Sequence, residues 1–362
     1  MRMRDFNGAG KASVIFGGQF GSEGKGLAAA WMAERSPADI FVTNASANAG
    51  HTTVFADGSK KVAFHLPSGA LVVPDSLIVL DAGAVIDPAG FMEEIDRLDI
   101  DPKRILIHPR AAIITAADRR REENARSPTT HIASTRKGVG AALTRKIARS
   151  SRLAGETRIL KPFIGRVDLN AMLSQGRSVQ IELPQGFSLG INSGLAYPEC
   201  TSREITVMQA LADAGIHPTF LGHVMMVLRT YPIRVGHITD GNGQIIGHSG
   251  PSCTDQREIA FGDIGVAAEY TTVTKRKRRI FTFSRAQVQT AAALNRPDVV
   301  FLNFVNYLKS APELDRIEGD IKAAFRTAGL PVPKLVYGLG PALTDVAIRR
   351  PAKPEAYNGP RF

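Results

Sequence analysis

A glycine-rich stretch near the start of the chain has the residue types of a phosphate-binding loop. It runs from Gly17 to Gly26, between a short apolar run and a run rich in alanine. A strand, a glycine turn and a helix in this order direct backbone N–H groups toward a phosphate, and Lys25 adds a positive charge. Gln19 stands where the P-loop pattern has a glycine, and Gly26 where it has a serine or threonine. The stretch therefore predicts phosphate binding without the usual hydroxyl ligand for magnesium, with a plain glycine turn as the alternative.

Two polar side chains follow predicted strands, which is where ligands bind in open α/β sheets. His51 lies in the loop after the apolar residues 40–42, and it could act as a general acid, stabilise an oxyanion or be structural. Gln185 follows the alternating run 179–183. Its amide could pair with a purine edge, because it both donates and accepts, or it could lie on the surface.

Two basic segments are candidates for binding anions. Residues 134–140 combine hydroxyls, cations and glycines, which suits either a phosphate site or a solvated loop. In the second segment, residues 274–279, Arg276 and Arg278 would share one side of an extended chain and could bind a carboxylate or phosphate bidentately. The second segment also fits a nucleic-acid patch or a targeting signal, but it lacks interleaved aromatic residues for stacking on single strands.

Apolar runs alternate with helical patterns along most of the chain. Residues 27–35 read as a helix, and Pro88 is a typical first residue of another. This rhythm predicts an α/β fold with a large, mainly parallel central sheet flanked by helices. We expect a flexible basic tail at residues 1–12 and a single domain at residues 13–362. The expected strands are 13–16, 40–42, 71–73, 76–80, 104–107, 179–183, part of 221–236, 299–308 and 335–337.

The composition is that of a folded protein with anionic partners. Of the 362 residues, 44% are hydrophobic, which suffices for a packed core, and the net charge of +11 favours nucleic acid or small phosphorylated substrates. No apolar run has membrane-spanning length and the start of the chain lacks a signal peptide, so we expect a cytoplasmic protein without a membrane partner. Cys200 and Cys253 give neither a disulfide framework nor a metal-site spacing, which suits a reducing compartment.

Several segments together resemble the adenylosuccinate synthetase family, and they do so in order over nearly the whole chain. The resemblance implies a ligase that joins L-aspartate to C6 of a purine nucleotide, using a nucleoside triphosphate and a 6-phosphoryl intermediate. It also implies Mg²⁺ as cofactor, a homodimer and no direct nucleic-acid partner. The matching segments are residues 18–26, 48–52, 64–69, 135–140, 185–186, 197–202, 234–236 and 274–279.

The resemblance also implies roles for residues at matching positions, including one, Arg149, that would reach over from a partner subunit. The catalytic residues would be Ser22, Lys25, His51 and Gln185. The purine nucleotide would be bound by Ser22, Asn48, Ala49, Thr135, Arg149, Gln185 and Thr201, and aspartate by Val273, Thr274 and Arg276. The triphosphate would be bound by Gly21, Glu23, Gly24, Lys25, Gly26, Gly50, His51, Thr52, Arg278, Asn303, Asn306, Gly338 and Gly340, and Mg²⁺ by Ser22 and Gly50.

The chain departs from the family pattern at two informative positions. The family has an aspartate where this chain has Ser22, and that aspartate removes the N1 proton and helps to bind Mg²⁺. A serine hydroxyl is a poor base, but it is smaller and can bond to the 2-amino group of a guanine. The family also has an aspartate that reads the guanine of GTP where this chain has Asn306, and asparagine suits adenine better. These changes predict dGMP as the substrate and ATP or dATP as the donor.

Both departures resemble the phage-type branch of the family, which forms the precursor of 2-aminoadenine for modified DNA. In that case the compartment would be the host cytoplasm. An ordinary member of the family that uses IMP and GTP is the first alternative. A nucleic-acid-binding protein built on a catalytically dead scaffold is the second, prompted by the net charge of +11.

Overall fold

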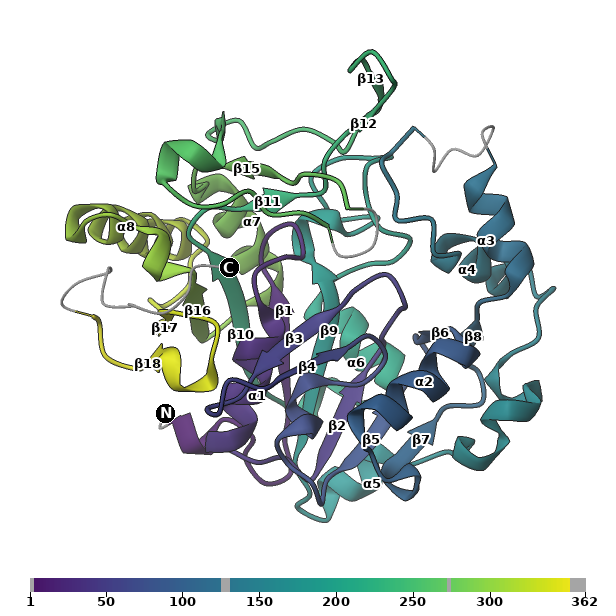
Figure 1. Cartoon of the computed structure of the whole chain (residues 1–362). Helices are drawn as coiled ribbons and strands as arrows, with labels where there is room; N and C mark the ends of the chain where they lie inside the picture. Colours follow the sequence, from purple (N-terminus) through teal and green to yellow (C-terminus); the bar gives the residue numbers. More distant parts are fainter. Residues whose placement is uncertain (1–2, 125–130, 272–274, 352–362) are drawn as a thin grey trace.

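The computed structural model describes residues 3–124, 131–271 and 275–351, and a nine-stranded sheet forms its centre (Figure 1). Neighbouring strands in this sheet are parallel except for the antiparallel pair at one edge, β17 and β18. The predicted α/β class with a mainly parallel sheet is confirmed. The order across the sheet is β18 (Val346–Ala347), β17 (Lys334–Gly338), β16 (Val299–Asn303), β10 (Leu221–Arg229), β1 (Ala12–Gly17), β9 (Val179–Gly186), β2 (Ile40–Thr43), β5 (Leu77–Leu80) and β7 (Ile105–Ile107).

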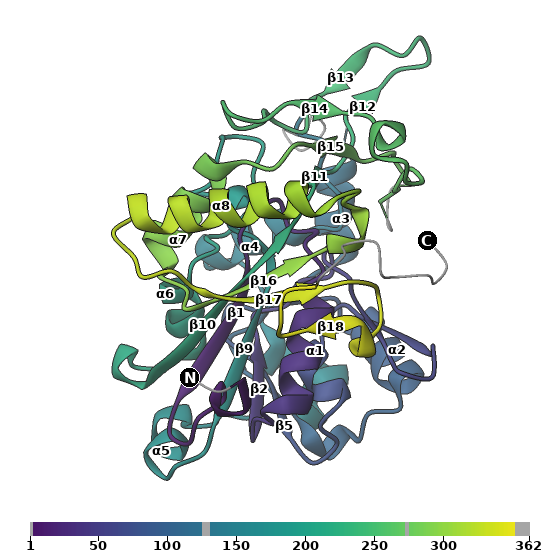
Figure 2. The ribbon, with the colours of Figure 1, turned by 90° about the vertical axis from the view of Figure 1, so that its left-hand side faces the viewer.

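Helices cover both faces of the sheet (Figure 2). Strand β1 is buried over its whole length because its side chains alternate between two cores. Val14 and Phe16 pack with α6 (Val207–Ala214), α7 (Arg285–Asn295) and α8 (Ala311–Thr327). Ile15 points the other way and packs with α1 (Lys25–Arg35), which includes the buried Trp31. On that side α2 (Pro88–Leu98) adds a third core around Phe91, and it begins at the proline that the sequence indicated.

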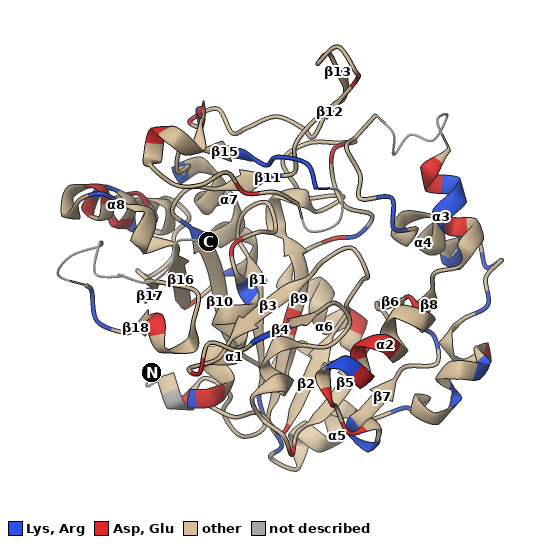
Figure 3. Ribbon diagram, viewed as in Figure 1, with Lys and Arg blue, Asp and Glu red and all other residues tan. Residues whose placement is uncertain are grey.

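Smaller elements surround the carboxyl ends of the central strands. The remaining helices are short: α3 (Ala116–Glu123) and α4 (Val139–Ile147) lie near this region, whereas α5 (Leu169–Ser174) lies at the other end of the sheet, before β9 begins (Figure 1). The small sheets pair β3 (His51–Val54) with β4 (Lys60–Ala63), β6 (Val85–Ile86) with β8 (Ala112–Ile113), and β12 (Ile238–Thr239) with β13 (Ile245–Gly247). A three-stranded sheet joins β11 (Ile233–Arg234), β15 (Arg279–Phe281) and β14 (Glu258–Ile259). Figure 3 shows the basic residues that lead into β15.

One strand prediction was wrong and another was wrong in part. Residues 71–73 do not form a strand, because a 3-10 turn at Ser68–Leu71 continues into a helical conformation at Val72. The predicted strand 299–308 ends at Asn303, because Phe304 has a positive φ of 60° and a 3-10 turn follows at Val305–Tyr307. A left-handed residue cannot continue the extended ladder of a strand.

The start of the chain also differs from the expected flexible tail at residues 1–12. Phe6 is fully buried, and Met3 packs with it in the core beside α1. Asn7 donates to the Ser36 carbonyl and, at 2.9 Å, to Gln180 Oε1. In the sequence, the basic residues of this segment suggested a solvent-exposed tail, although Met3 and Phe6 are apolar and pack into the core. In the described part of the chain, no helix is long and apolar enough to cross a bilayer.

Candidate active site

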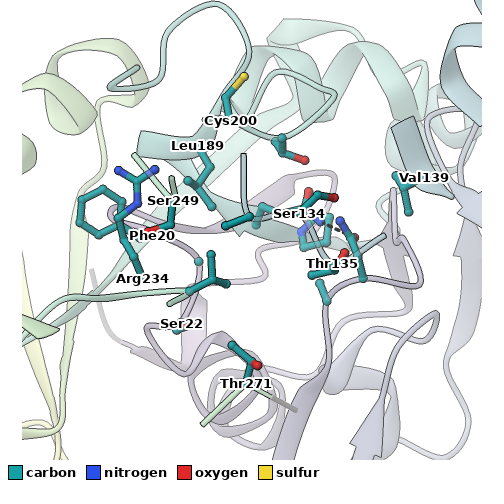
Figure 4. A pocket seen from close by; sticks show the side chains of 18 of the residues that line it. Phe20, Ser22, Ser134, Thr135, Val139, Leu189, Cys200, Arg234, Ser249 and Thr271 are labelled. Atoms are coloured by element: carbon teal, nitrogen blue, oxygen red, sulfur yellow. Dashed lines mark hydrogen bonds between the residues drawn. The ribbon is translucent and has the colours of Figure 1, made fainter. Parts of the chain in front are cut away.

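Two adjoining pockets open at the carboxyl ends of the central strands. The loops that follow β1, β2 and β9 line the first pocket, which Figure 4 shows with the side chains of Ser22 and Thr135. The loops that follow β1, β10, β16 and β17 line the second. The two linings share five residues, and groups bound in the two pockets would meet there: Gly21, Ser22, Gly50, His51 and Arg278. We call these five residues the junction.

The phosphate-loop candidate is shaped by an internal carboxylate. Glu23 is 1% exposed and accepts hydrogen bonds from the backbone N–H groups of Gln19 at 3.1 Å and Gly21 at 2.7 Å. It also pairs with Lys25 Nζ at 3.1 Å. A Cβ at Gly17 would lie 2.4 Å from the Glu23 carboxylate, so that glycine makes room for it. The side chain of Glu23 therefore stabilises the loop from inside and is not available to a triphosphate, which leaves only its backbone for the predicted role, whereas Lys25 lines the second pocket.

The glycine at position 26 has a steric cause. A Cβ at Gly26 would lie 2.8 Å from the Thr52 carbonyl oxygen and 3.2 Å from both His51 Cβ and Ser68 Oγ. Contacts of this length leave no space for the serine or threonine of a P-loop. Helix α1 thus packs directly against strand β3, and this packing brings the loop next to His51.

A buried carboxylate orients His51. Glu182, on β9, lies 2.5 Å from His51 Nδ1 and also accepts from the backbone N–H and hydroxyl of Ser68, at 2.7 and 3.1 Å. Burial alone would raise the pKa of Glu182, but the charge and hydrogen bond of His51 hold that pKa below its ordinary value. An ionised Glu182 accepts from Nδ1–H, so Nε2 is the ring atom available to a bound group, and it donates to that group when the ring carries both protons. Its contact with the Pro184 carbonyl oxygen is long, at 3.4 Å.

The first pocket gathers most of the predicted purine-nucleotide residues: Ser22, Asn48, Ala49, Thr135, Gln185 and Thr201. Gln185 Nε2 donates to Ser46 Oγ at 2.9 Å and to Asn48 Oδ1 at 3.1 Å. Gln185 Oε1 is buried and has no hydrogen-bond partner among the described residues. This oxygen can accept from a donor on a bound base. Arg149 is exposed just beyond α4 and lines neither pocket of the described chain.

Ser22 meets a cation at the junction. Arg278 Nη1 donates to Ser22 Oγ at 2.9 Å, across 256 positions of sequence. Burial lowers the pKa of Arg278, partly offset by the nearby Glu269. Because Ser22 is neutral, the charge of Arg278 stays available to an anionic group in either pocket.

The predicted aspartate residues are only partly placed. Val273 and Thr274 lie outside the described residues. The Arg276 guanidinium donates to the carbonyl oxygens of Ala133 at 3.2 Å and Ser134 at 3.0 Å, and it lines neither pocket as described. Its backbone N–H donates to Thr271 Oγ1, and Thr271 does line the first pocket.

The two asparagines after β16 have different surroundings. Asn303 Nδ2 donates to the Glu23 carbonyl at 3.0 Å, and Asn303 Oδ1 accepts from the N–H of Phe304 at 2.9 Å. A Cβ at Gly24 or Gly338 would lie within 2.3 or 2.2 Å of this amide. Asn303 therefore holds the phosphate loop to the sheet in space that Gly24 and Gly338 leave open, whereas Asn306 and Gly340 line the second pocket beside Gly24 and Thr52.

Comparison with known proteins gives the chain its family. The sequence profile described as Adenylosuccinate synthetase matches residues 14–158 and 156–318. The chain belongs to the adenylosuccinate synthetase family. It is 38% identical over 360 residues to the N6-succino-2-amino-2'-deoxyadenylate synthase of Salmonella phage PMBT28, covering 93% of this chain and 97% of that protein. It is 39% identical over 340 residues to the synthase of the same name from Acinetobacter phage SH-Ab 15497, covering 85% and 87%.

A solved structure agrees with this membership. The succinoaminodeoxyadenylate synthetase of cyanophage S-2L, bound to dGMP and dATP as an energy donor, superimposes with a TM-score of 0.82 at 36% identity. The match covers 93% of this chain and 95% of that chain. The adenylosuccinate synthetase family consists of C–N ligases that bind nucleotides, so the ligase class predicted from the sequence is confirmed.

The family implies a Mg²⁺ ion, and the donors at the junction fit one that is held mainly by nucleotide phosphates. The described residues contain no group of three or more His, Cys, Asp or Glu side chains that could hold a metal. The two expected ligands, Ser22 and Gly50, both lie at the junction and offer only neutral oxygens. Mg²⁺ takes few protein ligands at such sites, because it keeps waters and binds phosphate oxygens. When bound, the ion would neutralise charge on those oxygens.

The residues of the second pocket that were missed in the sequence include four with charged or aromatic side chains: Arg229, Glu269, Phe304 and Tyr307. The Arg229 guanidinium is buried, lies 3.7 Å from the Phe304 ring centre and pairs with Glu269. The Tyr307 hydroxyl donates to Glu269 at 3.3 Å, and burial raises the pKa of Tyr307 to about 12. A charged residue directly after the apolar run 224–228 was the signal that could have indicated Arg229.

Proposed function

We propose that this protein joins L-aspartate to C6 of dGMP with hydrolysis of ATP or dATP. The product would be 2-amino-2′-deoxy-N6-succinyladenylate, a precursor of 2-aminoadenine in DNA. The observation that carries the proposal is the neutral Ser22 at the junction, hydrogen-bonded to Arg278, where the family has an aspartate. The phage relatives named as synthases of this nucleotide, and the cyanophage enzyme bound to dGMP and dATP, support it.

Ser22 suits guanine for two reasons. Its side chain is shorter than that of aspartate, which leaves space beside N1 for the 2-amino group. Its hydroxyl can accept a hydrogen bond from that amino group while Arg278 donates to the same oxygen. The acceptor Gln185 Oε1 in the first pocket would bind a base donor such as N1–H.

The reaction would proceed in two displacements. In the first, the guanine loses its N1 proton to solvent and O6 attacks the γ-phosphorus, so that the bond from phosphorus to the bridging oxygen breaks and ADP or dADP leaves. Lys25 and the loop N–H groups would hold the phosphoryl group, and His51, oriented by Glu182, would donate to the leaving oxygens. In the second, the aspartate amine attacks C6, loses a proton and expels phosphate.

The second pocket would bind the donor. The Asn306 amide can accept from and donate to an adenine edge, and Gly340 lies in the same lining. We infer Mg²⁺ as the cofactor through Ser22, Gly50 and the phosphates. We also infer a homodimer in the host cytoplasm, in which Arg149 of one subunit reaches the purine nucleotide of the other. The exposure of Arg149 is compatible with that role.

The test is an activity assay with two nucleotide pairs. Purified protein is incubated with L-aspartate, Mg²⁺ and either dGMP with ATP or dATP, or IMP with GTP, and the succinylated product is quantified. Product from the dGMP pair only is expected. Product from the IMP pair only would favour an ordinary adenylosuccinate synthetase. No product from either pair, together with salt-sensitive DNA binding, would favour the nucleic-acid-binding scaffold.

A further inference from the structure

A buried charged cluster lies behind the wall of the first pocket, and the proposed reaction does not use it. It contains Asp81 after β5, Lys146 of α4, Arg203, and Asp213 of α6, together with Asn44 after β2. We call these five residues the Arg203 cluster. Asp81 is 2% exposed and Arg203 is 9% exposed. Burying the guanidinium of Arg203 is costly, so its retention calls for a physical reason.

Arg203 connects two segments that are far apart in the sequence. Its Nη1 donates to the backbone carbonyl of Asn44, and its own carbonyl accepts from the N–H of Ile191 at 3.0 Å. The Asn44 side chain donates to Asp213 Oδ2 at 2.8 Å, and Gln209 donates to Asp213 Oδ1, also at 2.8 Å. Arg203 thus ties residues 200–203 to the loop after β2 and to helix α6.

Two of the three guanidinium nitrogens of Arg203 make no hydrogen bond to a described residue. Its Nε and Nη2 are buried without a hydrogen-bond partner among the described residues, and so is Asp81 Oδ2. The other Asp81 oxygen accepts from the N–H of Gly83 at 2.8 Å. A buried polar group without a partner costs about 1–3 kcal/mol, and a charged one more. An apolar residue at position 203 would avoid this cost. We therefore look for a role of the contact between Arg203 and Asn44 in ligand binding.

Both segments that Arg203 joins end in the first pocket. The loop after β2 leads from Asn44 to Asn48, which contacts Gln185. On the other side, Thr201 and Ser202 line the same pocket directly before Arg203. The separation of these two walls decides whether Asn48 and Thr201 can bind one phosphate group together.

We propose that Arg203 is a positioning residue for the purine nucleotide: through the Asn44 carbonyl it sets the distance between the walls that carry Asn48 and Thr201. The proposal rests on the proposed function only in taking a purine 5′-monophosphate as the ligand of this pocket. It assigns Arg203 to the affinity for that nucleotide, and not to the donor nucleotide or to phosphoryl transfer.

The experiment measures two affinities in one variant. Arg203→Met removes the guanidinium with little change in length, and calorimetry gives the affinities for dGMP and for a non-hydrolysable ATP analogue. Arg104→Met is the matched control, because Arg104 also donates to backbone carbonyls, of Ala70, Val73 and Ser76, but lines neither described pocket. We expect Arg203→Met to weaken dGMP binding about tenfold or more and to change ATP-analogue binding less than about twofold. The control should leave both affinities at the wild-type values.

Three outcomes would overturn the proposal: unchanged dGMP binding in Arg203→Met, equal loss of both affinities, or the same selective loss in Arg104→Met. If Arg203→Met does not fold, Arg203→Gln is used, since its amide is too short to reach the Asn44 carbonyl, and the same selective loss is expected. Failure of the proposed function is distinguishable. If wild-type protein binds IMP and not dGMP, the measurement is made with IMP, and the expected loss is the same.

Discussion

Ser22 determines the charge balance at the junction. The Ser22 hydroxyl accepts a hydrogen bond from Arg278. Because this hydroxyl is neutral, it does not cancel the positive charge of Arg278. An aspartate at this position would form a close ion pair with Arg278 and would be an acceptor with no hydrogen to donate. Compared with an aspartate, the neutral Ser22 hydroxyl therefore leaves more space for a bound purine and makes the electrostatic potential around it more positive.

Ser22→Asp should lower the rate of product formation with dGMP by about tenfold or more, because the carboxylate removes space for the 2-amino group and neutralises Arg278. The rate with IMP, which has no 2-amino group, should fall less or rise. Steady-state kinetics with both nucleotides provides the comparison. Equal loss with dGMP and IMP would contradict the account given for Ser22.

His51→Ala should lower kcat by about two to four orders of magnitude, because its Nε2–H would no longer stabilise the leaving oxygens. The affinity for dGMP should stay close to that of the wild type. His217→Ala, at an exposed position, is the control and should keep full activity. A kcat within about twofold of the wild type would exclude His51 from the chemical step.

At the scale of elements, the unit from β1 through the glycine loop to α1 is fixed by contacts from distant parts of the chain. Asn303 of β16 holds the Glu23 carbonyl, and β3 packs against Gly26. The conformation of the loop therefore depends on contacts with α1, with the β3–β4 hairpin and with the central sheet. Substitutions that conform to the P-loop pattern should therefore still lower stability where they disturb this packing.

Gly26→Ser, which restores the P-loop residue type, should lower the free energy of unfolding by about 1–3 kcal/mol, because its Cβ would approach the Thr52 carbonyl at 2.8 Å. Turnover should also fall, since His51 would be displaced. Gly319→Ala in α8 is the matched helical control: nothing lies within 4 Å of its Cβ position, and stability should rise by about 0.5–1 kcal/mol. Chemical denaturation measures both. A Gly26→Ser protein as stable as the wild type would refute the steric explanation.

The turn after β16 should determine donor choice through one of its two asparagines. Asn306→Asp should shift the preference from ATP toward GTP by about tenfold, because a carboxylate accepts from both donors of the guanine edge. Asn303→Asp should instead lower activity with both donors, since it would break the bond to the Glu23 carbonyl. Competition assays with the two triphosphates measure the preference, and an unaltered preference in Asn306→Asp would place the base elsewhere.

At the scale of the whole molecule, a buried carboxyl group near the carboxyl end of β5, that of Asp81, links the free energy of unfolding to pH. Burial, followed by the charge of Asp213, raises the pKa of Asp81 to about 8. Between the ordinary pKa of an aspartate and pH 8, the folded state keeps a proton that the unfolded state has lost. Stability contributed by this group is therefore lost as the pH rises through this window.

Asp81→Asn should remove that loss, because an amide does not titrate and its oxygen can still accept from Gly83. The free energy of unfolding of the variant should match that of the wild type near pH 4. It should exceed the wild-type value by on the order of 5 kcal/mol at pH 9, because each unit of pKa difference contributes about 1.4 kcal/mol. Urea unfolding across this pH range gives both curves. A difference that does not change with pH would show that Asp81 is ionised in the folded protein throughout.

Much of this molecule was readable in the sequence because the relevant signals are local. Apolar runs between helical patterns predicted most strands of the parallel sheet, and Pro88 marked the start of α2. The order of the motifs predicted the family. Local spacing is sufficient for these features, since each is set by residues that are neighbours along the chain.

The roles inside the site were decided only by the tertiary structure. Only the fold shows that the Glu23 side chain accepts from the loop's own N–H groups, and Asn303 differs from Asn306 only in what surrounds it. Glu182 and Arg203 gave no local signal, because their partners lie more than a hundred positions away. Hydrogen bonds and steric limits act between atoms in space, so these roles exist only once the strands have placed their ends together.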